Sequence, residues 1–382
     1  MSDNHTEKEM YNLTVKTFHG LENLLATEIK KAGGQEVKIV TRAVKFKGDL
    51  ETIYRVNYQT RTGINVLQEL KSFKASSSEE LYEKTFDFEW DTYMSIEKTF
   101  SIDNTVHSAI HSHSHFAALK VKDAIADYFM KKYEKRPSVN TENPDIKIHL
   151  HISDDRCTLS IDTSGEALFK RKYRQQTDVA PLNEILAAGI VMLSDYKNID
   201  YFYDPMCGSG TILIEAALIF MKIPPGYFRK NFGFRGMKNY DYRIWNKVKK
   251  ECDNQINKDV TVKFIGTDIN QKATEIAKKN IDSAGLRNYI QVITKDFIGS
   301  KIMDKKGLIV TNPPYDVRIK NDDIDLLYKN IGDTLKNGFV NWKAYIFSGN
   351  SQAEKKIGLK PEQKINLYNG KIECNLLKFN IY

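Results

Sequence analysis

The chain has 382 residues, 41% hydrophobic and 11% aromatic, which is enough to bury the cores of two or three domains. No apolar run approaches the roughly 20 residues that a membrane helix needs, and the polar N-terminus excludes a secretory signal peptide, so we expect a cytoplasmic protein without a membrane partner. The net charge of +8 favours a polyanionic partner, and the four scattered cysteines favour a reducing compartment.

The first 60 residues predict a small α+β unit. Residues 12–18 alternate as a strand, and apolar residues from Leu21 to Ile29 repeat at helical spacing up to Gly33-Gly34. Short strands are expected over 37–40 and 43–46, followed by a helix over 50–58.

Residues 61–165 predict a second unit of mixed structure. Strands are expected over 64–70, 99–102, 146–152 and 157–161. The segment 116–133 reads as a helix, with Phe116, Leu119, Ile125 and Phe129 near one face. The stretch 164–176 that follows is rich in Gly, Lys, Arg and Tyr and is interpreted as a basic connector.

From Thr177 onward strands and helices alternate. We expect helices over 181–193, 211–220, 271–284 and 325–336, and strands over 201–203, 262–266, 290–294, 308–311 and 344–347. This order predicts an α/β fold with a parallel sheet covered by helices on both faces. Ligands of such sheets bind beyond the carboxyl ends of the strands, where the chemically interesting residues of this chain fall.

A glycine motif, Asp204-Pro205-Met206-Cys207-Gly208-Ser209-Gly210-Thr211, joins the first of these strands to its helix. The glycines let the backbone approach a ligand, and the helix start presents N–H groups. No Lys-Ser/Thr pair follows, and Leu213 replaces the third glycine of a dinucleotide fingerprint. An acidic residue before the glycines suits a cationic amino-acid moiety and disfavours a pyrophosphate, so a sulfonium-bearing ligand is preferred to NAD.

Two further aspartates end the next strands. Asp268, followed by Ile269, can accept hydrogen bonds from both hydroxyls of a ribose, although a strand-end Asp is often only a helix cap. Asp296, followed by Phe297, would meet an adenine amino group, with a simple loop aspartate as the alternative. The long interval between the glycine motif and Asp268 is explained by an insertion over 223–259.

The motif Thr311-Asn312-Pro313-Pro314-Tyr315 ends a fourth strand. Two prolines fix the backbone there, so the Asn312 amide oxygen and the Pro313 carbonyl can serve as two rigid acceptors. Two acceptors match an exocyclic –NH₂ group, whose lone pair they would free for in-line attack on a sulfonium methyl. Tyr315 offers a ring on which an extruded base can stack.

Together these residues resemble the Rossmann-like class I methyltransferases of the N6-adenine/N2-guanine type, from Thr177 to about Asn350. The resemblance implies S-adenosylmethionine as cofactor, with the Asp204 loop on its methionine part, Asp268 on its ribose and Asp296 on its adenine. Residues 176–183 are similar to that family's additional motif beside the methionine end. The implied cofactor residues are Thr177, Asp204, Pro205, Gly208, Gly210, Thr211, Asp268, Ile269, Asp296, Phe297 and Asn312, and the implied catalytic residues are Asn312, Pro313, Pro314 and Tyr315.

The segments 17–22 and 114–129 resemble the ferredoxin-like and THUMP parts of RNA-modifying enzymes, and residues 367–374 resemble the C-terminal region of bacterial N2-guanine methyltransferases of large-subunit rRNA. The resemblance implies a ferredoxin-like domain over 1–60, a THUMP domain over 61–165 and a Rossmann-like methyltransferase domain over 166–382. Some relatives carry a second methyltransferase domain; this chain would perform only one reaction.

The expected RNA contacts are basic or aromatic residues of the helix 116–133 and of the connector, where a solvated charged face is the alternative. They are Lys120, Lys122, Arg171, Lys172, Tyr173 and Arg174. Interleaved aromatic and basic residues of the insertion, such as Phe232 and Phe234, suit single-stranded RNA or simply pack in a core. The histidines between His107 and His115 lack a cysteine or carboxylate at ligand spacing, so no metal site is expected.

The sequence thus predicts methyl transfer to the N2 of a guanine in 23S rRNA or its assembly intermediate. The choice of guanine depends on the resemblance, because the Asn-Pro-Pro-Tyr motif accepts an adenine amine equally. A tRNA guanine-N2 methyltransferase, an adenine-N6 methyltransferase and a non-catalytic RNA-binding assembly factor are the alternatives, and an oxidoreductase is disfavoured by Asp204 and Leu213. The oligomeric state is left open.

Overall fold

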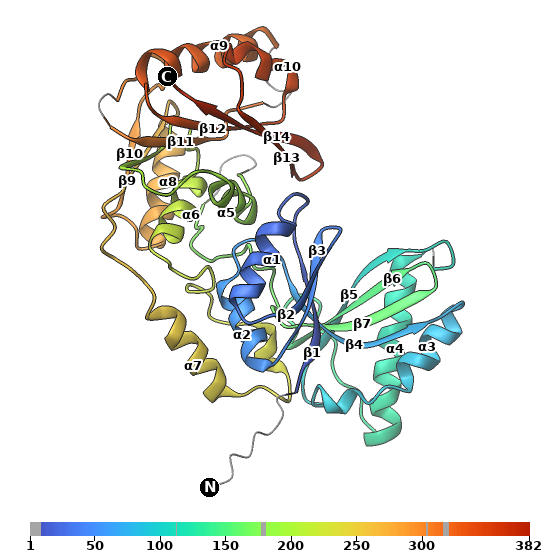
Figure 1. The fold of residues 1–382 in the computed structure, drawn as a ribbon. Helices are drawn as coiled ribbons and strands as arrows, with labels where there is room; N and C mark the ends of the chain where they lie inside the picture. Colours follow the sequence, from blue (N-terminus) through green and yellow to red (C-terminus); the bar gives the residue numbers. More distant parts are fainter. Residues whose placement is uncertain (1–8, 112, 177–180, 303–304, 316–320) are drawn as a thin grey trace. The chain divides into compact units, whose positions relative to one another are not determined.

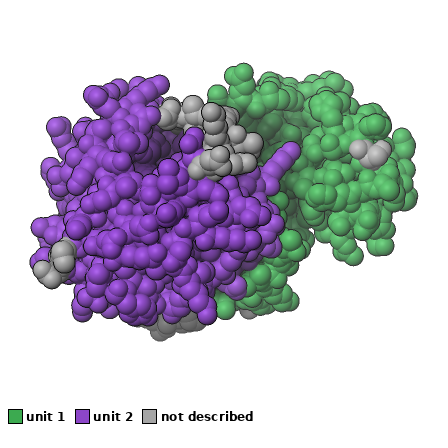
Figure 2. All heavy atoms as spheres, turned by 90° about the horizontal axis from the view of Figure 1, so that it is seen from above, with its two compact units in different colours: residues 1–16, 26–168, 229–251 green, residues 17–25, 169–228, 252–382 purple. Residues whose placement is uncertain are grey.

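The computed structural model describes residues 9–111, 113–176, 181–302, 305–315 and 321–382 (Figure 1). The chain divides into two compact units, coloured separately in Figure 2. Unit 1 comprises residues 1–16, 26–168 and 229–251, and unit 2 comprises residues 17–25, 169–228 and 252–382. Each unit therefore contains a segment that the sequence order alone would assign to the other.

Unit 1 is built on a seven-stranded sheet of order β2-β3-β1-β4-β7-β6-β5, in which β5 and β6 are parallel and the other neighbours are antiparallel. Its strands are β1 (Tyr11–Lys16), β2 (Gln35–Val40), β3 (Ala43–Gly48), β4 (Val66–Lys74), β5 (Phe100–His107), β6 (Ile146–Ser153) and β7 (Arg156–Asp162). Its helical segments are α1 (Glu22–Lys31), which begins in unit 2, α2 (Leu50–Gln59), α3 (Ser78–Phe86), η1 (Trp90–Thr92), α4 (Ser114–Tyr133), η2 (Gly233–Gly236) and α7 (Tyr242–Asp253).

The helix starts in unit 1 follow from their capping residues. The Asp49 carboxylate accepts a hydrogen bond from the Thr52 N–H, and the Ser77 hydroxyl accepts one from the Glu80 N–H. Within α4 the small residues Ala117 and Ala124 are buried, whereas Phe116 is 50% exposed. Of the face predicted from the sequence, Ile125 and Phe129 are buried and Phe116 and Leu119 are exposed, so the prediction holds only for the second half of the helix.

The insertion over 223–259 supplies core residues to unit 1. The rings of Phe232 and Phe234 are buried and stacked, with centroids 5.2 Å apart, and both lie against Trp245. Arg229 is buried as well and donates hydrogen bonds to the carbonyls of Ser164, Glu166 and Ala167. Of the two alternatives for these aromatic residues, packing in a core is therefore confirmed and binding of single-stranded RNA is wrong, because the buried rings cannot stack on a base.

Unit 2 confirms the predicted α/β fold with a mainly parallel sheet. The strand order is β10-β9-β8-β11-β12-β14-β13, parallel from β10 to β12 and antiparallel for β14 and β13. The strands are β8 (Tyr201–Asp204), β9 (Lys263–Asp268), β10 (Ile290–Thr294), β11 (Gly307–Thr311), β12 (Lys343–Ser348), β13 (Gln363–Asn369) and β14 (Ile372–Asn380). The helical segments are α5 (Glu184–Leu193), α6 (Thr211–Phe220), α8 (Gln271–Ser283), α9 (Asn321–Gly338), α10 (Ser351–Glu354) and η3 (Lys355–Ile357).

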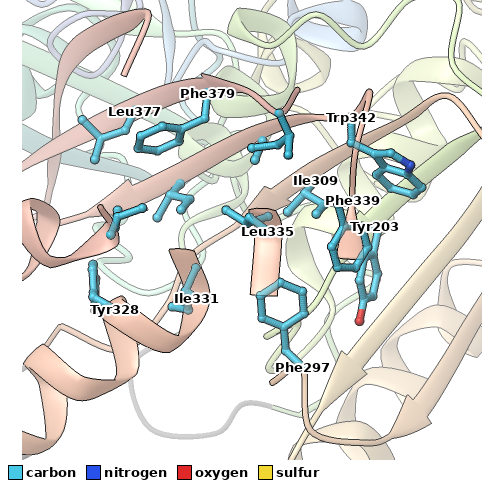
Figure 3. Packing of buried hydrophobic residues seen from close by; sticks show 14 of the residues in the cluster. Tyr203, Phe297, Ile309, Tyr328, Ile331, Leu335, Phe339, Trp342, Leu377 and Phe379 are labelled. Atoms are coloured by element: carbon cyan, nitrogen blue, oxygen red, sulfur yellow. The ribbon is translucent and has the colours of Figure 1, made fainter. Parts of the chain in front are cut away.

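One face of this sheet packs against α9 through a cluster of aromatic and aliphatic side chains (Figure 3). Tyr203, Phe297 and Phe339 form its aromatic centre, with ring centroids 5.6 to 6.1 Å apart. Tyr203 is the last residue before Asp204, so the cluster fixes the strand end from which the glycine motif departs. Helix α5 begins at Glu184, where the Asn183 side chain caps it, and not at Pro181 as the sequence suggested.

Candidate active site

The predicted site residues of unit 2 follow the carboxyl ends of neighbouring parallel strands. Asp204 of β8 is paired with Gly266 of β9, and Asp268 of β9 with Thr294 of β10. On the other side of β8, Tyr203 is paired with Ile309 of β11. Because parallel strands end at the same edge, the glycine motif, the two later aspartates and the Asn-Pro-Pro-Tyr motif share that edge of the sheet.

The glycine loop is held to β9 by two hydrogen bonds of Thr267, one through its carbonyl and one through its hydroxyl. The Cys207 N–H donates to the Thr267 carbonyl over 2.9 Å, and the Thr267 hydroxyl donates to the Pro205 carbonyl over 3.1 Å. Gly208 and Gly210 have φ angles of 51° and 81°, in the left-handed region that favours glycine. A Cβ at Gly208 would meet nothing within 4 Å, so the loop is open to a ligand at that point.

Asp268 lies directly beside this loop. Its Oδ2 accepts a hydrogen bond from the Gly208 N–H over 2.9 Å, and its Oδ1 accepts one from the Asn270 N–H over 2.9 Å. Each carboxylate oxygen retains a further lone pair for a ligand hydroxyl. The next residue, Ile269, is 72% exposed, which is unusual for an isoleucine and leaves an apolar surface beside the carboxylate.

Asp204 is buried beneath the loop. Burial and, to a smaller extent, the neighbouring charge of Asp268 raise the pKa of its carboxyl from 3.8 to about 7. Asp204 is therefore divided between its neutral and ionised forms near neutral pH. A cation bound at this end of the site would favour the ionised form and lower that pKa.

Asp296 and Phe297 take different positions from each other. Asp296 is exposed beyond β10, and its Oδ1 accepts a hydrogen bond from the Ile298 N–H over 2.9 Å. Phe297 is buried in the aromatic cluster against Tyr203 and Phe339. The ring of Phe297 thus supports the segment that follows β10, and its role beside the cofactor stays a prediction.

The Asn312 side chain carries an unsatisfied acceptor. Among the residues that the structure describes, its buried Oδ1 accepts no hydrogen bond. Such a group costs free energy unless a donor binds it. Pro313 is buried and Pro314 exposed, as expected for a rigid turn whose first residues face into the strand end.

Tyr315 is held by residues to which sequence reasoning gave no role. Its hydroxyl accepts a hydrogen bond from Asn369 Nδ2 over 2.8 Å, and its ring lies edge-on to Phe347, with centroids 6.4 Å apart. The ring also covers Gly349, where a Cβ would lie only 2.8 Å from two ring carbons. Burial raises the pKa of the Tyr315 hydroxyl above its usual value, so it remains protonated. The ring is half-buried and is fixed in one orientation.

The basic connector is folded against α5 and α6. Arg171 is 1% exposed and lies 3.5 Å from Glu215, and the buried Tyr173 hydroxyl donates to the same carboxylate over 2.9 Å. Arg174 pairs with Glu184 over 2.9 Å and donates to the hydroxyl of Thr211. The prediction that Arg171 and Tyr173 contact RNA is wrong, because their side chains satisfy a buried carboxylate, and Arg174 is likewise committed to the fold.

A second residue without a sequence signal, Asn280, ties the connector to the glycine loop. Its Nδ2 donates to the Ser209 and Gln176 carbonyls over 3.1 and 3.2 Å, and its Oδ1 accepts from the Gln175 N–H over 2.9 Å. The motif predicted over residues 176–183 begins at Gln176, which Asn280 holds in this way. Thr177 and residues 178–180 lie outside the described residues.

The remaining predicted RNA contacts are more exposed. Lys172 is exposed, the Lys120 ammonium lies 5.4 Å from the centre of the Phe116 ring, and Lys122 pairs with the adjacent Asp123. Over the described ranges, no group of three His, Cys, Asp or Glu side chains is placed to hold a metal ion. Within the same ranges, no helix is long and apolar enough to cross a membrane.

A cavity of about 880 Å³ lies away from the predicted site. It is lined by Ile199, Asp200, Lys306 and Gly307, at the amino-terminal ends of β8 and β11. None of the predicted site residues lines it. It is therefore a separate hollow on the far edge of the sheet.

Comparison with known proteins identifies the family. The model described as the RMKL-like methyltransferase domain matches residues 171–378. The chain belongs to this methyltransferase family. The models of the RlmL ferredoxin-like domain and the THUMP domain match residues 12–67 and 75–162, which confirms the predicted order of these parts along the chain.

Two relatives of this chain differ from each other in length. Ribosomal RNA large subunit methyltransferase K/L of Syntrophotalea carbinolica is 36% identical over 95% of this chain and 52% of its own length, so the chain spans about half of such relatives. A Synechocystis protein named as an RNA methyltransferase, slr0064, is 35% identical over 95% of both chains.

A solved structure resembles this chain along nearly its whole length. SMU.472, described as a methyltransferase and complexed with SAH, superimposes with a TM-score of 0.89 and 29% identity, covering 98% of this chain and 99% of its own. S-adenosylmethionine is the methyl donor of the family, and the prediction of this cofactor is confirmed at that level.

Proposed function

We propose that this chain transfers a methyl group from S-adenosylmethionine to the exocyclic N2 of a guanine in 23S rRNA. The observation that carries the proposal is the buried Oδ1 of Asn312, an acceptor without a donor at the carboxyl end of β11. An incoming amino group would satisfy it. The Pro313 carbonyl, fixed by the two prolines, would accept the second amino hydrogen.

The proposed cofactor cradle uses the groups at the neighbouring strand ends. The open loop at Gly208 and the Asp204 charge would hold the methionine part, with Thr177, Pro205, Gly210 and Thr211 around it. The two carboxylate oxygens of Asp268 would bind the ribose hydroxyls, Ile269 would cover one face of the adenine, and Asp296 would accept its amino group.

The proposed methyl transfer depends more on the orientation of the amine than on acid–base catalysis. The cofactor supplies an electrophilic methyl carbon on a positively charged sulfur. Asn312 and Pro313 would hold the amine so that its lone pair points at that carbon, and Tyr315, fixed by Asn369, would stack the base. The N–C bond would form as the C–S bond breaks, and the nitrogen, then cationic, would release a proton to water.

The substrate part of the proposal depends on the N-terminal matches and on the relatives' names. A ferredoxin-like domain over 1–60 and a THUMP domain over 61–165 would bind the RNA, and residues 166–382 would carry out the transfer. The K/L relatives are named for large-subunit ribosomal RNA. We propose 23S rRNA or an assembling particle as substrate and the cytoplasm as the location.

Methyl transfer from tritiated S-adenosylmethionine to protein-free total RNA, followed by nucleoside analysis, tests the proposal. We expect label in N2-methylguanosine of 23S rRNA. Label in tRNA would contradict the substrate, and label in N6-methyladenosine would contradict the base. A protein that binds the cofactor but labels neither free RNA nor ribosomal particles would be a binding factor rather than an enzyme.

A further inference from the structure

One face of the unit 1 sheet gathers basic side chains from five strands. Cross-strand partners share a face of a sheet. Lys38 of β2 is paired with Lys45 of β3, and Lys45 with Thr14 of β1, so these three side chains lie on one face. Lys16 follows Thr14 by two residues and therefore lies on the same face. On β6, Lys147, His149 and His151 alternate on one face, and the pairing of His149 with Asp103 extends it to β5.

This face is concave. Lys16 Nζ on β1 lies 2.7 Å from His149 Nε2 on β6 and 3.4 Å from the Thr105 hydroxyl on β5. Strands β4, β7 and β6 stand between β1 and β5 in the sheet, so a flat sheet would separate β1 from β5 by roughly 19 Å, four strand spacings. The Lys16 and Thr105 side chains, whose polar atoms lie 3.4 Å apart, are together too short to span that distance. The sheet therefore curls around Lys16, and the buried His149 forms the floor of a trough.

The trough is positively charged and its rim is exposed. Lys38 and Lys45 are exposed, and within the described ranges neither pairs with a carboxylate. Burial, followed by the charges of Lys16, His107 and Lys45, lowers the pKa of His151, because these basic side chains face the same space. Carboxylates offset only part of the charge. Asp103 pairs with Lys147 over 3.4 Å, and the buried Asp162 accepts a hydrogen bond from Asn65.

We propose that this basic trough, defined by Lys16, Lys38, Lys45, Lys147, His107 and His151, binds the phosphate backbone of the substrate RNA. The inference rests on the proposed function, because it takes RNA as the substrate. A concave row of lysines, of which Lys38 and Lys45 pair with no carboxylate among the described residues, fits a polyanionic strand. It also supplies the RNA contact that the buried Arg171 and Tyr173 cannot make.

The test measures binding of fluorescein-labelled, protein-free 23S rRNA to the full chain without cofactor, from about 50 to 200 mM salt. The variant K38Q/K45Q should bind about tenfold more weakly, and the slope of log K against log salt should fall by about 2, one for each lost phosphate contact. The variant K38R/K45R should restore both values. Both lysines are exposed, so thermal unfolding should be unchanged.

The matched control is R243Q/K250Q, which removes two exposed cations from α7, on the helix whose Trp245 packs against Tyr58 of α2. It should leave affinity and slope as in the wild type. An unchanged slope in K38Q/K45Q, or an equal loss in the control, would overturn the proposal. Because no methyl transfer is measured, failure of the proposed reaction would appear separately, as an RNA-binding protein that labels nothing.

Discussion

Asn369 Nδ2 donates a hydrogen bond of 2.8 Å to the hydroxyl of Tyr315, joining the β13–β14 hairpin to the motif at the end of β11. The register between β12 and β14 pairs Ser348 with Asn375, so the hairpin tip at residues 369–372 extends beyond the carboxyl edge of the sheet. The hairpin is therefore placed to position a residue of the candidate active site.

Replacing Asn369 by Leu should lower kcat/KM for RNA about three- to tenfold, the worth of one hydrogen bond, because Tyr315 loses its fixed orientation. Cofactor affinity, measured by calorimetry, should not change. The control is Asn366→Leu on the same strand, whose side chain bonds Glu373 instead. Equal losses in both variants would show that hairpin stability alone is responsible.

Replacing Asn312 by Ala should reduce the methyl-transfer rate by a factor on the order of 100, because it removes an acceptor that orients the amine. The dissociation constant of S-adenosylhomocysteine should stay within about twofold of the wild-type value. A comparable loss of cofactor binding would contradict the role given to Asn312.

Replacing Asp268 by Ala should act in the opposite sense and weaken cofactor binding about 10- to 100-fold, since charge-assisted hydrogen bonds to the ribose are lost. Calorimetry with S-adenosylhomocysteine measures this directly. The Asp268→Asn variant keeps one acceptor oxygen and should lose less cofactor affinity than the Ala variant. Unaltered cofactor affinity in the Ala variant would contradict the proposed hydrogen bonds between Asp268 and the ribose.

Cofactor affinity should increase as the pH rises from about 6 to 8, because the ionised form of Asp204, with its pKa raised to about 7, attracts the cationic end of the ligand. The stability of the unliganded protein should change with pH in the opposite direction. A raised pKa favours the folded state below about pH 4, and this contribution is lost as the pH rises through about 7. Asp204→Asn should give a flat affinity profile between pH 6 and 8; a wild-type profile that is already flat would refute the coupling.

Replacing Arg171 by Ala should lower the free energy of unfolding by about 3–5 kcal/mol, because it leaves Glu215 buried without its cation. The exposed neighbour Lys170 should tolerate Ala within about 0.5 kcal/mol. Urea unfolding of the two variants makes the comparison. Equal stability with weaker RNA binding in Arg171→Ala would restore the sequence-based interpretation.

The sequence was sufficient to locate the strand-end residues of unit 2. Alternating strands and helices determine a parallel sheet, and a parallel sheet brings Asp204, Asp268 and Asn312 to one edge wherever the intervening segments go. Local signals such as the glycine motif and the double proline need no long-range information.

The sequence was insufficient where burial decides the role of a residue. Arg171 and Tyr173 read as a charged surface, since their partner Glu215 is more than 40 residues away and nothing local marks it as buried. Asn369 lies in the segment 367–374, which carried the family resemblance, but it is 54 residues from Tyr315 and nothing in the sequence pairs the two residues. The aromatic residues of the insertion over 223–259 also resemble an RNA-binding surface in the sequence. Only the structure shows that Phe234 packs against Tyr54 and Trp245.

The most direct test of the proposed guanine-N2 methylation is nucleoside mass spectrometry of 23S rRNA from a source strain that lacks this gene, complemented with either the wild-type or the Asn312→Ala protein. We predict that one N2-methylguanosine disappears on deletion, returns with the wild-type protein and does not return with Asn312→Ala. An unchanged N2-methylguanosine content on deletion, or full restoration by Asn312→Ala, would contradict it.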